Sequence, residues 1–134
     1  LFWADYGGYM AIGYDPDAVP APTSLEDLLG EEYRGKVAIN GDPTQAGAAF
    51  AAVGLATVQN GGTLDDFSAG IDFFEQLNAV GNFVKIDPTP ATVASGETPV
   101  VFDWDYLNNG YAADLDGQRN WEVVVLPGTG YAGY

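Results

Sequence analysis

The chain has 134 residues and a formal net charge of −15, from 4 Lys and Arg against 19 Asp and Glu, with neither His nor Cys. Its length fits one domain. The scarcity of bases excludes nucleic-acid binding through a basic face and argues against docking on anionic lipid. The absence of His and Cys excludes imidazole or thiolate catalysis, disulfides and Cys/His zinc sites. No apolar run reaches the roughly 20 residues that membrane insertion requires. We therefore expect no cofactor, no nucleic-acid partner and no membrane insertion.

The first half of the chain predicts two strands and two helices. Residues 9–14 read as a strand that a turn at Asp15 closes. Thr23 and Glu26 have the spacing of a capping box, so a short helix should follow as far as Gly30. Residues 36–39 read as a buried strand. The next helix, residues 46–58, carries no charge and has mostly small apolar side chains, which is typical of a helix buried on all sides.

The second half predicts two more helices and three strands. Thr63 should cap a half-exposed helix that ends near residue 79 and whose core face is Leu64, Phe67, Ile71, Phe74 and Leu77. Thr89 should cap a short helix that ends at Gly96. The expected strands are residues 82–86, residues 99–102, which run on into 103–106, and residues 121–126. Strands that alternate with helices predict an α/β architecture.

A glycine-rich segment, residues 128–133, matches the spacing G-x-G-x-x-G after a strand. A dinucleotide site would need a helix directly after it and an acidic residue about 20 positions later. Here Pro127 precedes the segment and aromatic residues follow it, so we interpret it as a turn.

The best candidates for chemistry are Asp103, Trp104, Asp105 and Tyr106, which follow a buried strand. If the strand continues, the two carboxylates share one face and the two rings the other. This set could bind a cationic amine, ligate a hard metal ion or serve glycoside hydrolysis, or it could be a structural strand end.

A second candidate segment lies between a strand and the uncharged helix. Asp42, Thr44 and Gln45 stand there, where free N–H groups of the helix could receive an anion. Capping by Asp42 or Thr44 is the simpler interpretation.

Four short motifs in register resemble the family 1 extracellular solute-binding proteins of ABC importers, which include polyamine- and ferric-ion-binding members. They are G-Y-D at 13–15, P-T-S-L-E-D-L-L at 22–29, E-Y-R-G-K-V-A-I at 32–39 and A-S-G-E at 94–97. The resemblance covers essentially the whole chain. It implies one lobe, residues 1–134, of a type II periplasmic-binding-protein-like α/β fold, with a central mixed sheet flanked by helices.

The same resemblance implies a longer parent protein, in which residues 1–8 and 128–134 are crossover strands to a second lobe. Both chain ends look cut, which agrees with that expectation. The family further implies export to the periplasm or cell surface, an ABC permease as partner and no enzymatic activity.

Ligand positions carry over from the family residue by residue. Asp42 and Gln45 resemble the D-x-x-E pair of polyamine binders, with Gln45 in place of the acid. Trp104 stands where those proteins place an aromatic residue, and Tyr106 is the single tyrosine near the position where ferric-ion binders have adjacent tyrosines. The full set of candidate ligand residues is Trp3, Asp42, Thr44, Gln45, Asp103, Trp104, Asp105, Tyr106 and Tyr131.

The sequence therefore predicts non-covalent capture of a small, cationic, polyamine-like solute in a cleft between two lobes. Asp42, Asp103 and Asp105 supply negative charge with no base near them in sequence. The alternatives are binding of a ferric or other hard metal ion and, from a different class of protein, a carboxylate-dependent hydrolase.

Overall fold

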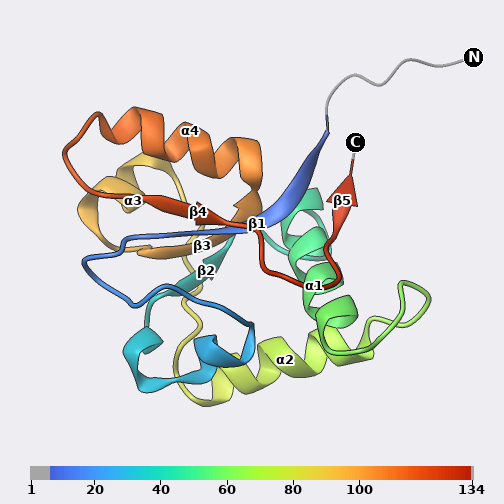
Figure 1. The fold of residues 1–134 in the computed structure, drawn as a ribbon. Helices are drawn as coiled ribbons and strands as arrows, with labels where there is room; N and C mark the ends of the chain where they lie inside the picture. Colours follow the sequence, from blue (N-terminus) through green and yellow to red (C-terminus); the bar gives the residue numbers. More distant parts are fainter. Residues whose placement is uncertain (1–6, 134) are drawn as a thin grey trace, which may run out of the picture.

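The computed structural model describes residues 7–133, which form one mixed sheet with helices on both faces (Figure 1). The strands are β1 (Gly8–Tyr14), β2 (Val37–Ile39), β3 (Val100–Trp104), β4 (Glu122–Val124) and β5 (Ala132–Gly133). The helices are α1 (Gly47–Gln59), α2 (Ser68–Ala79), α3 (Pro90–Ser95) and α4 (Asp105–Leu115), with short 3₁₀ turns η1 (Glu26–Leu29) and η2 (Glu31–Tyr33). The expected α/β architecture is confirmed.

The order of the sheet determines which segments share an edge. The strands lie in the order β2-β3-β1-β4, and β5 pairs with the start of β1. β2 and β3 are parallel, whereas β1 runs antiparallel to β3, β4 and β5. The carboxyl ends of β2 and β3 therefore meet the beginning of β1 and the short β5 at one end of the sheet.

Two buried clusters hold the layers together. The larger lies between the sheet and the α1/α2 side, and the smaller places Val93, Tyr111 and Leu115 of α3 and α4 against Val101 of β3. α1 is buried over most of its length, as its uncharged composition predicts. α2 crosses it closely at Gly70, whose N–H donates to Thr57 Oγ1 at 3.1 Å.

Several predicted boundaries are wrong. α2 begins at Ser68, because residues 63–66 form a turn. Leu64 and Ile71, expected in the core, are 59% and 51% exposed. The predicted strand 82–86 is reduced to a single bridge between Val37 and Phe83.

Of the predicted helix caps and strand ends, some are confirmed and others are displaced. Thr89 caps α3 with a reciprocal capping box, and Gly96 ends it with φ 84°, both as predicted. The expected box at Thr23 is displaced, because Asp27 and not Glu26 accepts the hydrogen bonds of Thr23. The strand over 121–126 extends only over β4.

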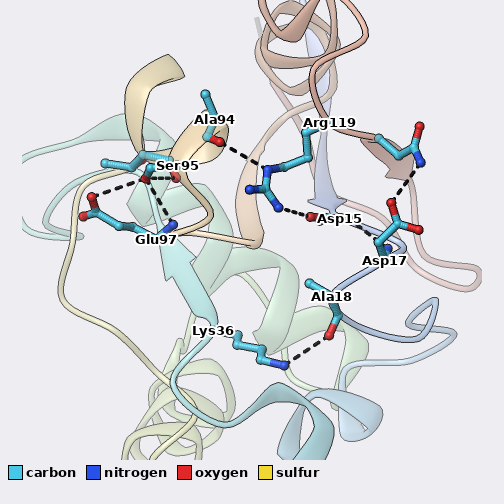
Figure 2. A network of polar contacts seen from close by, with 10 residues as sticks. Asp15, Asp17, Ala18, Lys36, Ala94, Ser95, Glu97 and Arg119 are labelled. Carbon is cyan, nitrogen blue, oxygen red and sulfur yellow. Dashed lines mark hydrogen bonds and ion pairs between the residues drawn. The ribbon is translucent and has the colours of Figure 1, made fainter.

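The end of the sheet far from β5 is held by a polar network, which Figure 2 shows. Arg119 Nη1 lies 2.7 Å from Asp15 Oδ2, and its Nε donates to the Ala94 carbonyl at 3.2 Å. Asp15 is 1% exposed, and its other oxygen accepts from Asp17 N–H. Lys36 Nζ donates to the Ala18 carbonyl nearby.

Candidate functional site

A pocket of about 300 Å³ opens at the end of the sheet where β3 stops, β1 begins and β5 lies. Helix α1 also begins there (Figure 1). The residues that line the pocket come from four elements and the segment before β5; they are Gly47, Phe50, Ala51, Trp104, Tyr106, Tyr131 and Gly133. Three of the nine candidate ligand residues, Trp104, Tyr106 and Tyr131, are thus brought together.

Two aromatic rings form one wall of this pocket. Trp104 is the last residue of β3, and Tyr131 directly precedes β5. Their ring centroids are 6.4 Å apart with the planes inclined at 40°. Both are half-buried, and the backbone N–H of Met10 fixes the segment by donating to the Tyr131 carbonyl at 2.8 Å. Both side chains line the pocket, so a solute held there would contact two aromatic residues.

Asp105 stands between Trp104 and Tyr106 in the chain, although it does not itself line the pocket. It is the first residue of α4, and its Oδ1 accepts from the backbone N–H groups of Tyr9 at 3.2 Å and Tyr106 at 2.9 Å. Among residues 7–133, its Oδ2 has no hydrogen-bond partner and the side chain forms no ion pair. One oxygen of this half-buried carboxylate therefore has no partner within the described part of the chain.

Asp103 lies in the interior. It is fully buried, its Oδ2 accepts from Asn40 at 2.9 Å and from the Tyr111 hydroxyl at 3.1 Å, and its Oδ1 accepts from Trp104 N–H. Burial raises the pKa of the Asp103 carboxyl above its ordinary value, although these hydrogen bonds oppose the rise. The expectation that Asp103 and Asp105 share a strand face is wrong, because the chain turns into α4 after Trp104.

Asp42, Thr44 and Gln45 are exposed and line no part of the pocket at Trp104. Asp42 Oδ1 accepts from the N–H and hydroxyl of Thr44, and these bonds lower the pKa of Asp42. The two residues close a turn before α1, but neither caps it, since its N-cap is Ala46. The predicted capping is therefore wrong in its detail.

Two further hollows adjoin this loop. Asp42 lines one of about 360 Å³ beside residues 83–87, and Thr44 lines a larger, mostly apolar one of about 690 Å³ between α1 and α2. Phe50 lines both the larger hollow and the pocket, and its ring lies 4.9 Å from that of Phe67. Phe50 was not among the residues predicted from the sequence, although it is the only aromatic side chain of α1.

The other features considered in the sequence are Trp3, the glycine-rich segment, metal ligation and membrane insertion. Trp3 lies outside the described residues. The glycine-rich segment turns at Gly128, with φ 98°, and leads into β5, so the interpretation as a turn is confirmed. No group of three or more acidic side chains in residues 7–133 could hold a metal ion, and no helix in that range is long and apolar enough to span a membrane.

A family described as bacterial extracellular solute-binding protein matches residues 2–130. No protein of curated function matches the chain. Among solved structures, an ABC transporter protein from Clostridium perfringens is 21% identical, with a TM-score of 0.74 over 94% of this chain and 40% of that one.

Two other structures carry a ligand class in their descriptions. A spermidine/putrescine ABC transporter substrate-binding protein from Streptococcus pneumoniae is 17% identical, with a TM-score of 0.67 over 91% of this chain and 36% of that one. The sulfate-binding protein from Mycobacterium tuberculosis is 20% identical, with a TM-score of 0.67 over 95% of this chain and 45% of that one. At these identities the likeness establishes the fold, and the chain spans about two fifths of each structure.

Proposed function

The chain belongs to the family of bacterial extracellular solute-binding proteins, and we propose that it supplies one wall of a site that captures a small organic cation for an ABC importer. The resemblance found in the sequence and the predicted fold, one lobe of a periplasmic-binding-protein-like protein, are confirmed. The expected location in the periplasm or at the cell surface is that of the family. The related structures are transport proteins, and we propose capture without reaction here as well.

The pairing of β1 with β5 supports a two-lobe arrangement. Gly8 and Tyr9 pair with Gly133 and Ala132, so both ends of the described chain leave the sheet together beside the pocket (Figure 1). We propose that residues 1–8 and 128–134 cross to a second lobe, which closes over the solute. An ABC permease would then receive the solute from the closed protein.

One observation carries the proposed charge of the solute. Asp105, the neighbour of Trp104 in the chain, has one carboxylate oxygen without a partner in residues 7–133, and neither Lys nor Arg is among the described residues that line the pocket. An ammonium group above an aromatic ring gains up to about 2 kcal/mol when it is desolvated. A charge-assisted hydrogen bond to Asp105 contributes about 1.5–3 kcal/mol. A polyamine-like solute would use both.

One feature of the pocket favours the opposite charge, so an anion belongs in the test. α1 begins at Gly47 on the pocket wall, and no side chain within residues 7–133 caps its first N–H groups. Such helix ends attract anions. Binding of a hard metal ion and hydrolase activity have less support, because both need several carboxylates at one site. Asp103 is buried and hydrogen-bonded to protein groups, and Asp42 lines a different hollow.

The test is calorimetric titration of the intact protein with spermidine and with sulfate. Asp105→Asn keeps an oxygen for the Tyr9 and Tyr106 N–H groups and removes only the charge. We expect it to weaken spermidine binding more than tenfold. Trp104→Ala should weaken it about thirtyfold. The matched control Asp114→Asn, an exposed acid on the same helix, should leave it unchanged.

Two outcomes contradict the proposal. Binding of sulfate but not spermidine would assign the pocket to an anion. Unchanged spermidine affinity in Asp105→Asn, together with a loss of about 3–5 kcal/mol of stability in Trp104→Ala, would make Trp104 a core residue and not a ligand.

A further inference from the structure

Gly54 is the one glycine in the interior of helix α1, where the composition of the rest of the helix favours alanine. Gly54 follows Val53 and precedes Leu55 in a helix otherwise built mostly of Ala and Val, and the position is buried. Apart from proline, glycine is the least favourable residue in a helix interior. Its φ is not in the left-handed region, so the helix backbone does not require it. The reason must lie in what packs against it.

The ring of Tyr131 occupies the space that a side chain would need. A Cβ built on Gly54 would lie 2.5 Å from Tyr131 Cε2, 2.7 Å from its Cδ2 and 3.3 Å from its Cζ, and these are the nearest atoms it would meet. Real Cβ atoms are essentially never closer than 3.0 Å to such a neighbour. The phenol ring therefore rests directly on the bare surface of α1.

The backbone around Tyr131 is held by bonds that leave the ring little freedom to retreat. Met10 N–H donates to the Tyr131 carbonyl at 2.8 Å. Gln59, at the end of α1, donates through Nε2 to the carbonyls of Pro127 and Thr129 at 3.2 and 2.6 Å. With the segment fixed to β1 and to α1, a methyl group at Gly54 would be relieved mainly by rotation of the Tyr131 side chain.

A second glycine lies against the other ring of the wall, in a less severe contact. A Cβ at Gly133 would lie 3.0 Å from Cη2 of Trp104, so β5 passes close over the indole edge. Both rings of the pocket wall thus lie against a residue without a side chain. The positions of the Trp104 and Tyr131 rings thus depend on glycine at position 54 of α1 and at position 133 of β5.

We propose that Gly54 is a positioning residue for the solute site: its missing side chain seats the Tyr131 ring in the pocket. The inference rests on the proposed function for its consequence, namely the effect on solute affinity. The contact between Gly54 and Tyr131 stands independently of which solute binds.

The test is a double-mutant cycle in the intact protein, with thermal unfolding and spermidine titration as the two measurements. Gly54→Ala alone should lower Tm, because the methyl group collides with the ring. In a Tyr131→Ala background the same change should raise Tm by about 3–6 °C, since alanine then only improves the helix. The control Gly110→Ala lies in α4 with nothing within 4 Å of its Cβ and should raise Tm in both backgrounds.

Affinity supplies the readout that a purely structural contact would not move. Gly54→Ala should weaken spermidine binding about 5- to 30-fold, and it should add nothing once Tyr131 is alanine. A rise in Tm in both backgrounds, or full spermidine affinity in Gly54→Ala, would overturn the proposal. If the native protein binds neither spermidine nor sulfate, the proposed solute class is wrong, whereas the reversal in Tm still decides whether Gly54 seats the ring.

Discussion

Arg119→Ala should destabilise the protein far from the pocket, because it removes one partner of an ion pair whose other partner is buried. Asp15 is 1% exposed and would keep a single donor, the N–H of Asp17 (Figure 2). Breaking a fully buried pair in this way costs about 3–5 kcal/mol. The Arg119 side chain is 33% exposed, so water can reach the vacated space and part of that cost is screened. We expect a loss of about 2–3 kcal/mol.

Urea unfolding of the native protein and the variant measures this loss directly. For a domain of this size it corresponds to a fall in Tm of about 7–11 °C. Arg34→Ala is the matched control, since Arg34 is exposed and, within residues 7–133, forms no hydrogen bond through its side chain and no ion pair. Its Tm should stay within about 2 °C of the native value. Equal stability of the two variants would mean that the Arg119–Asp15 contact contributes nothing, and a loss of spermidine affinity in Arg119→Ala would contradict its independence from the pocket.

Two further predictions concern a buried carboxyl and a helix crossing. Burial raises the pKa of Asp103 above 3.8, so the folded state holds this proton more tightly than the unfolded chain does. The protonated Asp103 carboxyl therefore stabilises the fold fully below pH 3.8, and this stabilisation is lost as the pH rises through the pKa of the folded state. We expect the Tm of the native protein to fall relative to that of Asp103→Asn between pH 4 and 7. Parallel Tm curves for the two proteins would refute this prediction. Gly70→Ala should cost about 1–3 kcal/mol in urea unfolding, because its Cβ would collide with the Val53 carbonyl and Thr57 Oγ1, whereas a gain in stability would show that α1 and α2 can separate freely.

The parts of the fold that depend on local composition could be predicted from the sequence. A run of 13 uncharged and mostly small apolar residues is typical of a buried helix, and most of α1 is buried. Thr89 and Gly96 define α3 because the cap and the left-handed terminus need those residue types at those positions. In such segments the backbone is determined by neighbours a few residues away.

Boundaries set by distant contacts could not be predicted. α4 contains Asn108, Asn109 and Gly110, which are poor helix formers, and it is held by the burial of Tyr111 and Leu115. The sequence therefore favours a strand that runs past Trp104. This affects the candidate residues, because the turn into α4 leaves Asp105 half-buried at the start of that helix, whereas Asp103 stays in the core.

The start of α2 shows a competition between two local signals. Thr63 is a good capping residue, but the helix begins five residues after it, at Ser68, whose N–H donates to Asp66 two residues before it. The helix follows the second signal, and Gly70 then sits against Thr57 of α1. Only the packing of the two helices decides between the signals, and it involves residues on both sides of a loop.

The placement of the bases says more about the solute than the net charge does. A chain with 19 acidic residues has carboxylates everywhere, so a charge of −15 alone selects no site. Two of the four bases, Arg119 and Lys36, are engaged in the network at the far end of the sheet (Figure 2). Lys85 lines the hollows beside Asp42 and α2 and not the pocket at Trp104. Asp105, next to the pocket residue Trp104 in the chain, thus has no ion-pair partner within residues 7–133, and an uncompensated carboxylate there favours the proposed cation over an anion.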